Sequence, residues 1–150
     1  MSTMYDAETK NRTIERLTKL VPDKKPLWGK MNVVEMLTHV NDGFRTPLRD
    51  RTPTPIGNFI MHTLGKFMIL NMKIPKGAPT HPETNPHIKG TKPETFELEK
   101  QKLIALIDRF QDAKESSLAE NHPVIGKMTH EKWGILMAKH VDHHFRQFGV

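Results

Sequence analysis

The chain contains no cysteine among its 150 residues. Disulfides, thiolate zinc sites, iron–sulfur clusters and a cysteine nucleophile are therefore all excluded. Any metal ion that this protein binds must be held by nitrogen or oxygen atoms. A length of 150 residues fits one domain with a single hydrophobic core, so we expect one domain over residues 1–150.

Long apolar runs are also missing. No segment approaches the roughly 20 apolar residues of a membrane-spanning helix. The N-terminal stretch MSTMYDAETKNRTIERL carries charges where a secretory signal would need apolar residues. We therefore expect a cytoplasmic protein with no membrane partner.

Several familiar signatures are absent. The sequence has no Gly-x-Ser-x-Gly elbow, no P-loop and no dinucleotide fingerprint, which leaves serine hydrolases, NTPases and Rossmann enzymes without support. His130 and Glu131 begin like the His-Glu-x-x-His pattern of zinc proteases. Gly134 stands where that pattern needs its second histidine, so the motif fails.

The charge is biased but not clustered. The formal net charge is +6, yet the 23 lysines and arginines are scattered and no basic run of five or six residues occurs. This distribution indicates a solvated surface and not a phosphate-binding stripe. We therefore expect no nucleic-acid partner, and a nucleic-acid binder stays as an alternative supported by charge alone.

Apolar residues at helical spacing are present in five stretches, and alternating strand patterns are absent. We expect helices over residues 6–20, 33 to about 45–49, 56–72, from after Thr91 to about 116, and 130–148. Capping boxes are expected at Asn32 with Glu35 and at Thr91 with Glu94, and Thr129 should cap the last helix. The helix over 56–72 is apolar almost all round, which predicts that it is the most completely buried.

These elements predict an all-α fold, an up-and-down four-helix bundle with an additional short helix and a long Pro-rich loop. The loop over residues 73–93 contains five prolines and two glycines, which excludes a continuous helix or a central strand. A loop of this length is usually a lid, a binding loop or disordered.

Two histidines stand out on the last helix, where His140 and His144 occupy positions of the apolar face. They are four residues apart, so their side chains lie about one helical turn from each other and can bind one ion. A third ligand must come from another helix, and His39 is the best candidate. His143, three residues after His140, is an alternative partner for His140.

A non-metal interpretation is open as well, because His-x-x-x-His is a short pattern in a chain with nine histidines. His140 and His144 would then be hydrogen-bonded core residues. For a metal site, Glu35 is expected to accept the outer ring N–H of a histidine, with Asp142 and Gln147 as weaker candidates.

The motif His140-x-x-His143-His144-x-Arg146-Gln147-Phe148-Gly149, together with Trp28-Gly29-Lys30-Met31 and the later His39, resembles the DinB/YfiT-like superfamily, in particular a branch described only as proteins of unknown function. The resemblance implies a four-helix bundle that holds a divalent metal ion with one histidine of the second helix and a His-x-x-x-His pair of the last. These positions correspond to His39, His140 and His144.

The same resemblance implies a function. It favours a metal-dependent enzyme, a transferase or isomerase that uses a low-molecular-weight thiol, with one divalent ion (zinc or nickel first) and a small-molecule substrate. The alternative is a non-catalytic helical bundle that acts as a binding or oligomerisation module. A homodimer stays open, as does the choice between His143 and His144.

Overall fold

The computed structural model describes residues 1–150 and is mostly helical. Its α-helices are α1 (Ala7–Thr18), α2 (Val33–Arg45), α3 (Lys66–Asn71), α4 (Phe96–Asp112) and α5 (His130–Gln147). The π-helical turn η1 (Met61–Gly65) precedes α3, and the 3-10 turns η2 (Pro82–Thr84) and η3 (Glu115–Ser117) flank α4. None of the helices combines the length and apolar character needed to cross a membrane.

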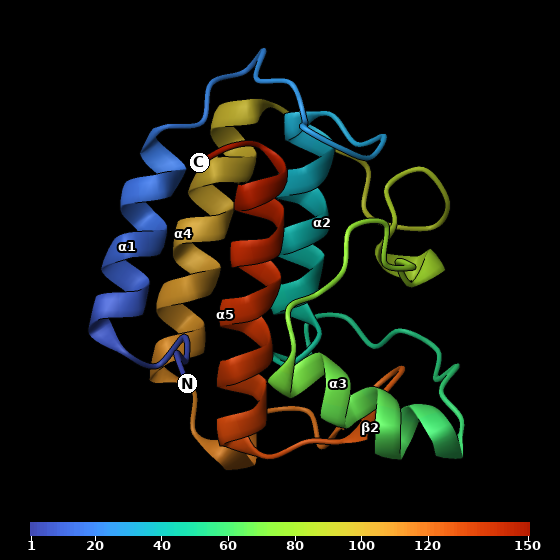
Figure 1. The fold of residues 1–150 in the computed structure, drawn as a ribbon. Helices are drawn as coiled ribbons and strands as arrows, with labels where there is room; N and C mark the ends of the chain where they lie inside the picture. The colour runs from blue at the N-terminus through green and yellow to red at the C-terminus, as the bar shows by residue number, and fades with distance from the viewer.

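The four long helices α1, α2, α4 and α5 lie side by side (Figure 1). Helices α1 and α5 run in one direction, and α2 and α4 run in the opposite one. The contacts agree, because Asn41 of α2 meets Glu99 early in α4 while Phe44 meets Phe110 near its end. In an up-and-down bundle, consecutive helices alternate in direction. Here α2 and α4 are parallel, so this part of the fold prediction is wrong.

The reason lies in residues 46–95 between α2 and α4. A short connection would force consecutive helices to be antiparallel. This long segment instead carries the chain back to the end at which α2 began, so α4 can start there and run parallel to α2 (Figure 1). The detour also builds η1, α3 and the loop over 73–93 on one side of the long helices.

Local capping signals explain where most long helices begin. Asn32 and Glu35 form the expected reciprocal capping box, and the Thr129 side chain accepts a hydrogen bond from Lys132 N. The expected cap at Thr91 is wrong, because Thr95 caps α4 by accepting from Leu98 N. Both hydrogen-bonding groups of Thr91 are instead engaged with the buried carboxylate of Asp42.

The core is a single cluster of 24 buried apolar residues drawn from all four long helices. Its largest fully buried side chains include Trp133, Phe44, Phe110, Phe145 and Phe148. Complete burial of an aromatic or aliphatic side chain contributes roughly 1.5–3 kcal/mol. The single cluster agrees with the prediction that residues 1–150 form one domain. That assignment stays a prediction.

The expectation of a deeply buried third helix is wrong. Leu70 is the one buried residue of η1 and α3. Phe59, Ile60 and Phe67 are 80%, 64% and 62% exposed. The helix is shortened to residues after Asn58 and lies outside the layer of the four long helices, so only one side of an all-apolar segment finds a partner (Figure 1).

A small antiparallel hairpin was not expected. Strand β1 (Asn121–His122) pairs with β2 (Gly126–Lys127), with His122 opposite Gly126. Strands of two residues are too short to produce an alternating pattern. The turn needs Gly126 at a positive φ of 70°, a conformation in which glycine carries no steric penalty.

Candidate metal centre

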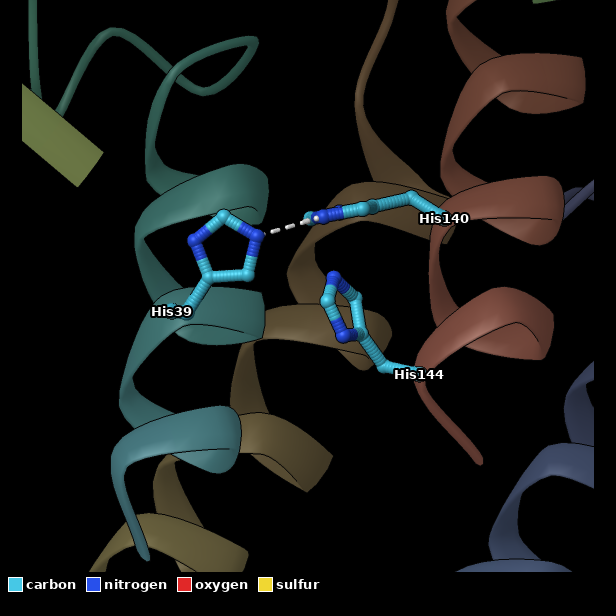
Figure 2. A group of neighbouring side chains, drawn as sticks. All are labelled: His39, His140 and His144. Atoms are coloured by element: carbon cyan, nitrogen blue, oxygen red, sulfur yellow. Dashed lines mark hydrogen bonds between the residues drawn. The ribbon is translucent and has the colours of Figure 1, made fainter. Parts of the chain in front are cut away.

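His39, His140 and His144 come together on facing sides of α2 and α5 (Figure 2). One ring nitrogen from each lies within 4.8 Å of the others. His39 Nε2 and His140 Nε2 are 2.9 Å apart. Three nitrogens at the zinc–nitrogen distance of about 2.1 Å from one ion would be about 3.4 Å apart in a tetrahedral site. Small side-chain rotations would therefore bring all three to a common ion.

The outer nitrogens of two of these rings are held by hydrogen bonds. His39 Nδ1 lies 2.7 Å from the Thr84 carbonyl oxygen, and His144 Nδ1 lies 2.8 Å from Gln147 Oε1. Since both partners are acceptors, each Nδ1 must carry the proton and donate. The lone pairs are therefore on the Nε2 atoms of His39 and His144, the tautomer that a metal ligand requires.

Burial also keeps these imidazoles neutral. Desolvation lowers the pKa of His140 and His144 well below the ordinary value, and the neighbouring imidazoles lower it further. Desolvation also lowers the pKa of His39, against the opposite effect of its bond to Thr84. Neutral rings are thus the expected state at neutral pH, with His140 Nε2 donating to the Nε2 lone pair of His39 until an ion takes its place.

Gly43 makes room for His140. A Cβ atom at this position of α2 would lie 2.8 Å from both Cε1 and Nδ1 of His140. Such a distance is shorter than van der Waals contact, so the ring can approach α2 because position 43 is glycine.

Gly43→Ala is therefore expected to push His140 away from the centre and to weaken metal binding about 10-fold, although alanine is the better helix former. Gly65→Ala is the matched control, since the closest atoms to its Cβ would be at the flexible end of Met61. Zinc titration calorimetry on both variants checks this. Equal zinc affinities would show that His140 tolerates the extra methyl group.

Gln147 links the two motif stretches that carry the superfamily resemblance. Its Oε1 accepts from His144, while its Nε2 donates to the Trp28 carbonyl at 2.8 Å. Gly29 has a φ of +83°, and a Cβ there would lie 2.6 Å from Gln147 Nε2. The glycine after Trp28 therefore allows the amide to reach both partners and to orient the His144 ring.

The other residues considered as support have different roles. Glu35, expected to orient a histidine ligand, instead closes the cap of α2 and meets His87 Nε2 at 2.9 Å. The Thr84 carbonyl, which no sequence pattern marks, takes that place for His39. Asp142 pairs with Arg16 and Arg146 and not with a histidine of the centre.

His143 is buried beside the three histidines, but on a different side of α5. Its ring meets Trp28 edge to face at 5.9 Å between centroids, and its Nδ1 is buried without a hydrogen-bond partner. The cluster of converging nitrogens contains His144 and not His143. This placement favours the pair formed by His140 and His144.

A cleft of about 610 Å³ opens beside the centre and is lined by His39, His140, His143 and His144. Residues 73–75 and 78–81, part of the Pro-rich loop, form one wall. Loop residue His81 lines the cleft, whereas His87 is turned to Glu35. Part of the loop over 73–93 thus lies beside the centre, while its role stays open.

Sequence reasoning missed His122, which lines the same cleft from the hairpin. Its Nδ1 accepts from Val124 N and Ile125 N at 3.1 and 3.3 Å. Desolvation lowers the pKa of His122 to about 4. The ring is therefore neutral, with its proton on Nε2.

This lowered pKa predicts an acid-sensitive stability. The unfolded chain takes up the His122 proton near pH 6.5, whereas the folded chain does so near pH 4. The folded state is therefore fully stable with respect to His122 above about pH 6.5, where this ring is neutral in both states. As pH falls toward 4, the free energy of unfolding decreases by up to about 3 kcal/mol, because only the unfolded chain binds the proton. His122→Asn keeps an acceptor but does not titrate, so its urea unfolding should depend less on pH in this range. An unchanged pH dependence would contradict this assignment.

Comparison with known proteins gives one match. The family described as "Protein of unknown function (DUF1569)" matches residues 3–149. No curated protein and no solved structure matches the chain. Because the match spans nearly all of the sequence, this chain belongs to the DUF1569 family of proteins of unknown function.

Proposed function

We propose that this protein is a divalent-metal-dependent enzyme of the DinB/YfiT-like type, a thiol-dependent transferase or isomerase. In this proposal the four long helices are the bundle of that superfamily. His39, His140 and His144 bind one ion, zinc or nickel first. The observation that carries it is the convergence of three imidazole nitrogens within 4.8 Å.

The donor set fits such an ion. Two of the rings have their outer Nδ1–H groups bonded to fixed oxygen acceptors, which leaves Nε2 lone pairs directed inward. Three neutral imidazoles are typical ligands of zinc and other first-row ions, and a three-ligand site keeps positions open. The cluster contains only histidines, so every ligand that it offers is a neutral imidazole.

A divalent ion at this place would supply Lewis acidity, lowering the pKa of a bound thiol or water toward neutrality. The chain's own residues would do the rest. Thr84 and Gln147 orient the ligands, and part of the loop over 73–93 lines the cleft in which a substrate would lie. The thiol of such a reaction would come from outside the protein, since the chain has no cysteine.

Cobalt substitution tests the proposal. Protein loaded with Co²⁺ and titrated with 2-mercaptoethanol should develop sulfur-to-cobalt charge-transfer absorption in the near ultraviolet, and ethylene glycol should not produce it. A cobalt-loaded protein without that band would reject the thiol part. A protein that binds no cobalt would reject the metal centre itself.

One observation favours a second candidate, an oligomerisation module. The apolar side chains of Phe59, Ile60, Leu64 and Phe67, which lie within or just before η1 and α3, are all more than half exposed. A second copy could cover this apolar surface in a homodimer. Sedimentation equilibrium of Leu64→Glu against the parent chain tests this, because a dimer using this surface would dissociate in the variant.

A further inference from the structure

The walls of the cleft beside the histidines are mainly apolar. They come from η1 and α3, the Pro-rich loop, the hairpin and α5, and include Met61, Ile69, Ile74, Val124, Ile125 and Leu136. No aspartate, glutamate or arginine lines the cleft, and Lys73 is its one lysine. A ligand inside would therefore meet hydrocarbon on most sides.

The polar groups of the cleft are largely engaged within the protein. His81 accepts from Glu83 N through Nδ1 and donates to the Thr54 carbonyl through Nε2. The hydroxyls of Thr46 and Thr84 donate to backbone carbonyls. Few protein groups remain to replace water around an ionised substituent, and burying such a charge without a partner costs several kcal/mol.

The volume of about 610 Å³ falls within the range of small-molecule sites, roughly 300–1,000 Å³. The three converging imidazoles form one part of the lining, and the apolar surfaces form the rest. The arrangement thus offers a single strongly polar point beside an extended hydrophobic surface.

We propose that the cleft binds an uncharged, mainly apolar small molecule through one metal-ligating head group. The head group lies at His39, His140 and His144, and the apolar body packs against Ile69, Ile125 and their neighbours. The position of the head group rests on the metal centre proposed above, whereas the preference for an apolar body rests on the cleft alone. Hydrophilic thiols with several ionised groups fit this cleft poorly.

Hydroxamic acids of increasing chain length are suitable probes, because the head group stays constant while the apolar body grows. On zinc-loaded protein, calorimetry should show affinity rising about fourfold per methylene from acetohydroxamate to octanohydroxamate. Succinate monohydroxamate, with an ionised tail, should bind no tighter than acetohydroxamate. A flat series, or tightest binding of the charged probe, would overturn the inference.

Ala78→Trp tests the location. Ala78 lines the cleft from the loop, so the indole should fill it and bring the affinity for octanohydroxamate down to that for acetohydroxamate, with zinc affinity unchanged. Lys89→Trp is the matched control, because this exposed residue of the same loop lies outside the cleft. Loss of chain-length dependence in both variants, or in neither, would contradict the proposed position.

Octanamide with metal-free protein separates the two proposals. Binding that Ala78→Trp removes would support the apolar cleft even if the protein takes up no metal. Stoichiometric zinc without any gain from longer chains would reject the apolar preference and leave the metal centre intact.

Discussion

Replacing His39, His140 or His144 with alanine is expected to abolish stoichiometric metal binding. Each side chain supplies one of three nitrogens within 4.8 Å, and two imidazoles cannot complete a zinc or nickel site. Since loss of a residue that merely orients a ligand already costs 10–100-fold, loss of a ligand should weaken zinc binding by more than about 100-fold. Elemental analysis of untagged protein and zinc calorimetry measure this.

His143→Ala is the matched control for this experiment, because it removes a buried histidine of the same helix that lies outside the converging cluster. It should keep one ion per chain. Circular dichroism would verify that all four variants stay helical. If His143→Ala loses the metal while His144→Ala retains it, the ligand pair is His140 with His143. If zinc and nickel leave the melting temperature of the parent chain unchanged, the proposal that these histidines bind a metal ion fails.

The second large effect is expected from Asp42→Ala. The Asp42 carboxylate is buried and accepts from Arg45 at 2.9 Å and from the backbone and hydroxyl of Thr91 at 2.9 and 2.7 Å. It therefore ties the end of the Pro-rich loop to α2. Removing it leaves the partly buried Arg45 guanidinium, whose side chain is 21% exposed, and two donors of Thr91 without their acceptor. This should cost about 2–4 kcal/mol in the free energy of unfolding.

Urea unfolding of metal-free protein measures that loss, and Asp142→Ala is the control. Asp142 also pairs with two arginines, both at 2.8 Å, but its side chain is 48% exposed. Its removal should cost less than about 1 kcal/mol. Because the loop carries Thr84 to His39, Asp42→Ala should also weaken zinc binding about 10–100-fold. Equal unfolding midpoints of the two variants would refute the anchoring role of Asp42.

Much of the secondary structure was predictable because its causes are local. The capping box of Asn32 with Glu35 involves residues three apart, and the spacing of His140 and His144 follows from helix geometry alone. Thr91 was misread for the same reason, since its sequence context matches a cap while its real partner, Asp42, lies 49 residues earlier.

The burial of the third helix could not be predicted from its composition. A segment that is apolar on all sides suggests complete burial only if neighbours surround it. Here the chain leaves α2 and returns to the start of α4, which places η1 and α3 on the outside with Phe59 and Phe67 exposed. The direction of α4 depends on the same path and has no signature in the helix itself.

The sequence by itself determined the absence of cysteine chemistry, the helical character and the candidate histidines. The first depends on composition, and the others depend on spacing within single helices. Only the tertiary structure decided that His39 meets His140 and His144, that Thr84 and Gln147 orient two of these rings, and that an apolar cleft opens beside them. These contacts join residues that are mostly far apart in the chain, and the path of the backbone between α2 and α4 brings them together.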